Sequence, residues 1–177
     1  MTQDSQIEAW LRGPLAGIPP YLQPPAHAFV MAREDVDAAV ADLYPSQIWT
    51  SPGGAASIGF HLVHMAGSTD RLLTYARGEP ISDAQRAALA VERDIADGVH
   101  APPALEALLA AWHHTVERAL QQIAHTPEST LLEPRAVGRQ RLPSTVLGLI
   151  FHSAEHAQRH VGQIITTAAV VRAGLPT

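Results

Sequence analysis

The spacing of apolar residues along the chain predicts long amphipathic helices. Between Ala26 and Leu43, apolar side chains recur every three or four residues, with charged residues between them. A second helix is expected from Ser57, a suitable N-cap, to about Tyr75, because Gly78 follows as a stop. No segment alternates polar and apolar residues well enough to require a sheet.

Two more long helices are expected in the second half of the chain. One begins near Pro103, a favourable residue for a first turn, and ends near His125. After a loop, Pro143 and Ser144 are expected to open the last helix, which closes at about Arg172. Four periodic stretches of this length predict an all-α fold, a four-helix bundle.

The remaining segments complete this organisation. The connection from Gly78 to Pro103 holds Ser82 and Gln85 in a capping-box pattern, so a long, partly helical crossover is expected between the second and third main helices. Residues 1–25 carry five prolines and are interpreted as an ordered, proline-rich N-terminal arm. A length of 177 residues suits one core, so residues 1–177 are expected to form a single domain.

Composition narrows the function classes. A hydrophobic fraction of 46% with 16% charged residues favours a compact globular protein over a disordered one. The net charge of −5 and the lack of a basic stripe argue against nucleic-acid binding. The N-terminus resembles neither a secretory signal nor a membrane span, so a cytoplasmic location without membrane association is the default expectation. The chain has no cysteine, so a metal would need nitrogen or oxygen ligands.

Histidines provide the candidate chemistry. Of ten in the chain, five fall into two clusters, His61 and His64 in the second helix and His152, His156 and His160 in the last. Residues four apart on a helix are one turn apart on the same side, so their imidazoles can converge on one ion. At about 100° per residue, His156 and His160 fall inside the apolar arc of the last helix and His152 at its edge.

Helical phase is less decisive for the other histidines. In the second helix the apolar arc lies closer to His61 than to His64. A hydrogen-bonded core histidine is the common alternative to a metal ligand, and a pair alone is a weak motif. His113 and His114 are interpreted as solvent-facing. A run of loop arginines, Arg135, Arg139 and Arg141, is more often solvated than part of an anion site.

The two clusters carry a family resemblance. The segment HLVHMAGSTDRLL, followed far downstream by HSAEHAQRHVGQII, resembles the DinB/YfiT-like superfamily of metal-binding four-helix bundles. The resemblance extends from about Pro25 to Arg172. It implies a mononuclear site made by one histidine of the second helix and two of the last, which fall on His64, His156 and His160. His61 and His152 are kept as substitute ligands or as partners of the ligands.

Three imidazoles would leave at least one coordination position for water or substrate, as in catalytic zinc sites. Zinc or nickel is the first choice of divalent ion, with iron or manganese as alternatives. Bundles that this chain resembles include thiol-dependent S-transferases and proteins described as metal-dependent hydrolases. The resemblance therefore implies a metal-dependent hydrolase or transferase that acts on a small-molecule substrate, with water or a small thiol cofactor. The alternative is a non-catalytic metal-binding or stress-related protein with a structural or vestigial site. A homodimer is compatible with exposed helix faces.

Overall fold

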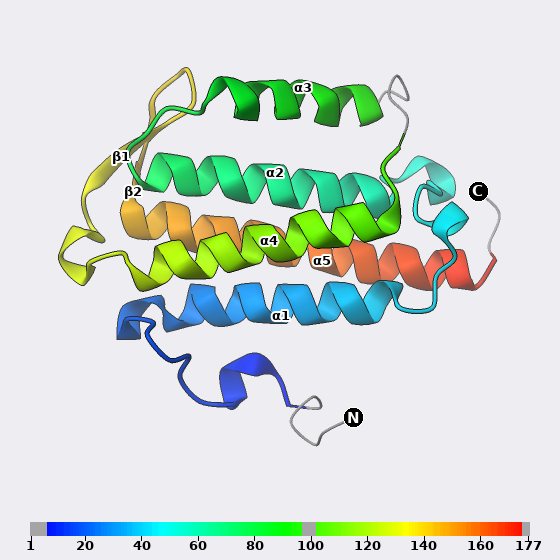
Figure 1. Cartoon of the computed structure of the whole chain (residues 1–177), viewed down its shortest axis with the longest axis horizontal. Coiled ribbons are helices and arrows are strands. Elements are labelled where there is room, and N and C mark those ends of the chain that lie inside the picture. The colour runs from blue at the N-terminus through cyan, green and yellow to red at the C-terminus, as the bar shows by residue number, and fades with distance from the viewer. Residues whose placement is uncertain (1–6, 97–101, 175–177) are drawn as a thin grey trace.

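The computed structural model describes residues 7–96 and 102–174, and α-helices dominate this part of the chain (Figure 1). The bundle consists of α1 (Gln23–Val40), α2 (Ile58–Ala76), α4 (Leu105–Ala124) and α5 (Val146–Arg172). Each helix packs on two neighbours: α1 on α4 and α5, and α2 on α4 and α5. In Figure 1, α1 and α5 run in one direction and α2 and α4 in the other. The expected all-α four-helix bundle is confirmed.

The crossover between the second and third main helices is also present. Because α2 and α4 run in the same direction, the connection between them must return along the bundle, and α3 (Asp83–Ala96) makes this return on the outer side of α2 (Figure 1). The capping box forms as expected. The Ser82 amide donates to Gln85 Oε1 at 2.8 Å, and the Gln85 amide donates to Ser82 Oγ at 3.1 Å.

The helix ends follow local capping chemistry. Ser57 caps α2, since its hydroxyl oxygen accepts a hydrogen bond from the Phe60 amide at 3.2 Å. The first helix begins at Gln23, before the predicted Ala26, because Pro24 and Pro25 fit a first turn that needs no amide hydrogen. Residues 23–25, which were expected to belong to the N-terminal arm (residues 1–25), are therefore part of α1. Short 3₁₀ turns occupy Ala9–Leu11, Pro20–Leu22, Pro45–Gln47, Pro52–Gly54 and Glu128–Thr130.

A small hairpin replaces the loop expected before the last helix. Strands β1 (Pro134–Val137) and β2 (Leu142–Thr145) pair antiparallel, with Pro134 opposite Thr145. The polar and apolar pattern did not reveal this hairpin because each strand has only four residues, too few for an alternation to stand out. The turn between the strands uses left-handed backbone at Gly138 (φ 67°) and Arg141 (φ 52°).

The hairpin also moves the start of the last helix. Pro143 and Ser144 were predicted to open it, but both lie in β2. Thr145 is the N-cap instead, and its hydroxyl oxygen accepts a hydrogen bond from the Gly148 amide at 3.0 Å. The helix begins at Val146 and ends at Arg172, and this end agrees with the prediction.

The hydrophobic core lies between the four long helices, and every one of them contributes to it. Its largest fully buried side chains from these helices include Phe29, Ile58, Leu62, Met65, Trp112, Ile123, Ile150 and Ile164. Within residues 7–96 and 102–174, no helix is long and apolar enough to cross a membrane. The contact of α2 with α5 is the one that brings the two histidine clusters together.

Candidate metal centre

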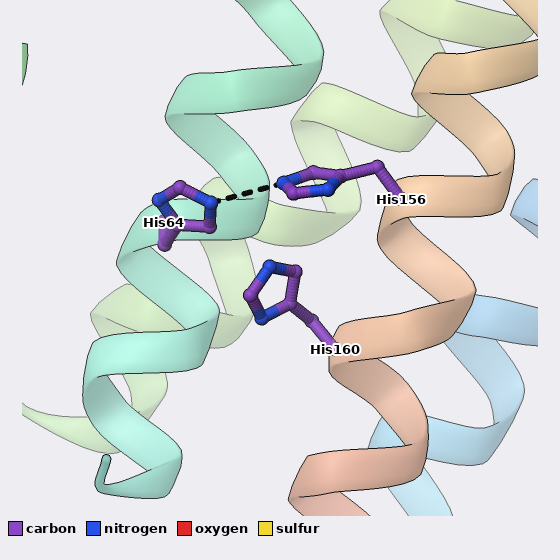
Figure 2. Close-up of side chains that lie close together, drawn as sticks. All are labelled: His64, His156 and His160. Carbon is purple, nitrogen blue, oxygen red and sulfur yellow. Dashed lines mark hydrogen bonds between the residues drawn. The ribbon is translucent and has the colours of Figure 1, made fainter.

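Three histidines from two helices meet between α2 and α5. His64 lies on α2, and His156 and His160 lie one turn apart on α5 (Figure 2). One ring nitrogen from each lies within 4.8 Å of those of the other two. The ring centroids of His160 are 4.6 Å from those of both His64 and His156, and the remaining pair is 5.1 Å apart. The structure thus places the three predicted residues in one cluster.

The local sequence of α5 leaves room for these rings. Ser153 and Ala157, next to the two histidines on the inward side of α5, are fully buried and small. Small side chains fill little of the space between the helices, so imidazoles can occupy it. The cluster is only partly enclosed, since 23% of the His64 side chain is exposed and His156 and His160 are half-buried.

His64 is held by a carboxylate from the crossover helix. Its Nδ1 lies 2.5 Å from Oε1 of Glu92, on α3. Because an ionised carboxylate can only accept, Nδ1 of His64 must be the protonated, donating nitrogen. In the neutral ring this leaves the lone pair on Nε2, which faces His156 Nε2 at 3.0 Å, the contact drawn in Figure 2. Glu92 thereby directs a ligand-capable nitrogen into the cluster.

Glu92 is buried, with 6% of the residue exposed, and is itself paired. Its second oxygen accepts a hydrogen bond from Nη2 of Arg71 at 3.2 Å. Burial raises the pKa of Glu92, but the hydrogen bond from His64 and the positive charge of Arg71 outweigh burial and hold it below the ordinary value. The carboxylate is therefore ionised at neutral pH and available as an acceptor.

His61 contacts the cluster through His160. It is 5% exposed, and its Nδ1 lies 2.9 Å from Nδ1 of His160. This contact engages Nδ1 of His160, which leaves Nε2 as the nitrogen free to face the other two rings. In Figure 2 one ring nitrogen of His160 points toward the gap between His64 and His156. His61 is thus placed as a partner of a candidate ligand.

Burial keeps three of these histidines neutral. It lowers the pKa of His61 and His156, and nearby His64 adds charge repulsion in both cases. For His160, burial and then repulsion from His64, His156 and His61 lower the pKa to about 4. Neutral imidazoles are the form that binds a metal ion.

The donor set fits a divalent transition-metal ion. Imidazole nitrogens suit zinc, nickel and iron. Two nitrogens that bind one zinc ion at about 2.0–2.1 Å with a tetrahedral angle are roughly 3.3 Å apart. The two Nε2 atoms of His64 and His156 are already close to that separation at 3.0 Å. The nitrogen of His160 lies within 4.8 Å of both, so side-chain rotations that bring it to a similar separation would let all three nitrogens reach one ion.

The other polar residues singled out in the sequence lie outside the cluster. His152 has an exposed side chain and pairs with Glu155 at 3.2 Å, and Glu155 also pairs with Arg159. His114 is exposed, as expected. His113 is only partly exposed, because it reaches Asp37 of α1 at 2.7 Å.

The arginine run also has a structural part. Arg135 donates from Nε to the Ala76 carbonyl at 2.8 Å and so ties β1 to the end of α2, whereas Arg139 and Arg141 are exposed.

Sequence reasoning missed Glu92 and Arg71. A weak indication existed in α3, where Gln85, Leu89 and Glu92 share one helical face and a glutamate occupies a position typical of an inward side chain. Its partner, His64, is far enough along the chain that only the packing of α3 on α2 reveals the pair.

An all-helical bundle with convergent histidines from α2 and α5 defines the class of this protein. The sequence model of the DinB superfamily matches residues 28–164, a span that includes all three clustered histidines and Glu92. The chain belongs to the DinB superfamily. No curated protein matches the chain.

Proposed function

We propose that this protein is a metal-dependent enzyme in which His64, His156 and His160 hold one divalent ion, zinc or nickel before iron or manganese. The observation that carries the proposal is the convergence of three ring nitrogens within 4.8 Å, with His64 Nε2 directed inward by Glu92. Oriented, neutral imidazoles are the usual ligands of catalytic zinc sites.

An open coordination position is part of the proposal. Neither residue kept as a substitute ligand is placed to close the shell, because His61 faces His160 and His152 is 48% exposed beside Glu155. A divalent ion with three protein ligands would act as a Lewis acid and lower the pKa of a water or thiol bound to it. This arrangement favours an enzyme over a protein with a structural or vestigial metal.

The reaction class follows from what the chain can supply. It has no cysteine, so a thiol nucleophile would have to come from a small thiol cofactor. We propose hydrolysis, or transfer of a small-molecule substrate onto such a thiol. A surface pocket of about 460 Å³, whose lining includes His61, Arg159 and Gln163, is connected to the cluster through His61, which contacts His160, and we propose it as the place for the substrate. A cytoplasmic location and a homodimer stay predictions.

The chain's own residues have defined roles in this proposal. Glu92 accepts a hydrogen bond from Nδ1–H of His64, which leaves Nε2 of His64 free to bind the ion, and His61 orients His160 through their Nδ1 contact. Arg159, exposed at the cavity, would attract an anionic group of the substrate.

The experiment is elemental mass spectrometry of the tag-free protein, before and after reconstitution with zinc, nickel, manganese and iron. About one ion per chain is expected for the wild type, followed by hydrolysis and thiol-transfer activity that a chelator removes. A protein that binds no ion under any of these conditions would refute the proposal. An ion without activity on either reaction class would favour the non-catalytic alternative.

A further inference from the structure

Helix α3 is attached to the bundle in an unusual way. Among residues 83–95, whose burial the structure describes, Glu92 alone is buried. The other side chains on this stretch are half-buried or exposed, and Gln85 adds a second polar attachment through its Nε2, which donates to Asp70 Oδ2 and Thr74 Oγ1. A surface helix normally docks through an apolar stripe. Here the most deeply buried contact is a carboxylate.

Both oxygens of that carboxylate have a defined partner on α2. Oε1 faces Nδ1 of His64 at 2.5 Å, and Oε2 accepts from Arg71 at 3.2 Å. Burying a carboxylate is costly unless it is paired, and a well-packed apolar residue would usually dock a helix at least as well. The position of Glu92 is therefore better explained by what it does to His64 than by its contribution to packing.

Helix α2 is shaped to receive this pair. A Cβ added at Gly67 would lie 2.7 Å from Nη1 of Arg71 and 3.1 Å from Oε2 of Glu92. Real Cβ atoms almost never show the first distance, so a side chain at this position would displace the arginine and press on the carboxylate. The glycine leaves the space in which Arg71 and Glu92 meet, one turn away from His64.

From these contacts we propose that Glu92 is a positioning residue, which holds His64 in the tautomer with Nδ1 protonated and Nε2 turned toward His156, so that the crossover helix α3 is part of the metal centre. This inference rests on the proposed function. Partners that orient a metal-binding histidine typically change metal affinity by about 10–100-fold when removed. Arg71 assists by fixing the second oxygen of Glu92.

The test compares wild type, Glu92→Ala and Glu92→Gln with Glu155→Ala as a control. Glu155 is next to His156 in sequence and pairs with Arg159 and His152. Histidine ¹⁵N NMR of the metal-free proteins reads the tautomer of His64, and competition with a chromophoric chelator measures zinc affinity. Circular dichroism checks that α3 is retained.

In the wild type we expect His64 to carry its proton on Nδ1. Glu92→Ala should shift it toward Nε2 and weaken zinc binding by about 10–100-fold. Glu92→Gln keeps an acceptor oxygen but loses the charge, so its zinc affinity should lie between those of wild type and Glu92→Ala. Glu155→Ala should have the zinc affinity and the His64 tautomer of the wild type. If Glu92→Ala does not fold, the zinc affinity of Glu92→Gln tests the role of Glu92: weaker binding than wild type supports it, and equal binding contradicts it.

The outcomes distinguish failure of the proposed role of Glu92 from failure of the proposed metal site. A wild type that binds zinc, with the same His64 tautomer and affinity in the Glu92 variants, would overturn the role of Glu92 and leave the proposed metal site intact. A wild type that binds no metal would overturn the proposed function and this role with it.

Discussion

Nε2 of His64 and Nε2 of His156 lie 3.0 Å apart, although 92 positions of sequence separate the two residues. Two imidazole nitrogens at this distance need either a shared proton or a shared cation between them. Since Nδ1–H of His64 donates a hydrogen bond to Glu92, the lone pair of the neutral ring lies on Nε2 and is directed at His156. A divalent ion would satisfy all three histidines of the cluster at once.

The ligand assignment predicts selective loss of metal. His156→Ala or His160→Ala should abolish stoichiometric binding, because two nitrogens hold a divalent ion much more weakly than three. His114→Ala, at an exposed position outside the cluster, should keep about one ion per chain. Metal content of the purified variants measures this, and equal retention in all three would contradict the assignment.

The lowered histidine pKa values predict a stability that depends on pH. The pKa of His160 is about 4 in the folded state, below the unfolded value of roughly 6.5. Between these values the unfolded chain binds more protons, so the free energy of unfolding should fall as the pH decreases through this window. After allowance for solvent screening, we expect a loss of about 1–2 kcal/mol from pH 7 to pH 5 in the metal-free protein.

Urea denaturation at the two pH values checks this prediction. His160→Gln removes one titrating group and should flatten the profile relative to wild type. An equally steep loss in the variant would show that the acid sensitivity has another source.

A methyl group at Gly67 should cost metal affinity. Replacing glycine by alanine inside a helix ordinarily stabilises the protein by roughly 1 kcal/mol. At Gly67 the new Cβ would displace the end of the Arg71 side chain from its place beside Glu92, so this gain should be reduced and zinc binding should weaken. Gly162 of α5 is a matched control, because a Cβ there meets no atom within 4 Å. Gly162→Ala should show the gain and keep its zinc affinity, as measured by urea denaturation and chelator competition.

The cap of α2 should contribute to stability without affecting the metal site. Ser57→Ala removes the acceptor for the Phe60 amide and should lower the free energy of unfolding by about 1 kcal/mol. Ser51→Ala is the control, since the exposed Ser51 makes no side-chain cap at the turn it precedes. Thermal denaturation should give a lower melting temperature for Ser57→Ala than for Ser51→Ala. Equal melting temperatures would contradict the role of the cap.

Much of the fold could be predicted from local patterns. Apolar spacing, the Ser57 cap and the capping box at Ser82 and Gln85 act over a few residues, and the structure has them as expected. The bundle follows because each amphipathic helix must bury one face. The pair His156 and His160 also needs only one helix, since residues four apart share a side of it.

The tertiary structure decided the rest of the candidate site. His61 and His64 point in directions about 60° apart around α2, so the rotation of α2 against α5 determines which of them joins the α5 pair. Helical phase alone favoured His61, whereas packing places His64 in the cluster and His61 behind His160. Glu92 comes from a separate helix, and its partner is determined by where the crossover lies on α2. Local sequence sets which residues become helical, but side chains distant in sequence meet only through the rotation and docking of whole helices, which the packed core fixes.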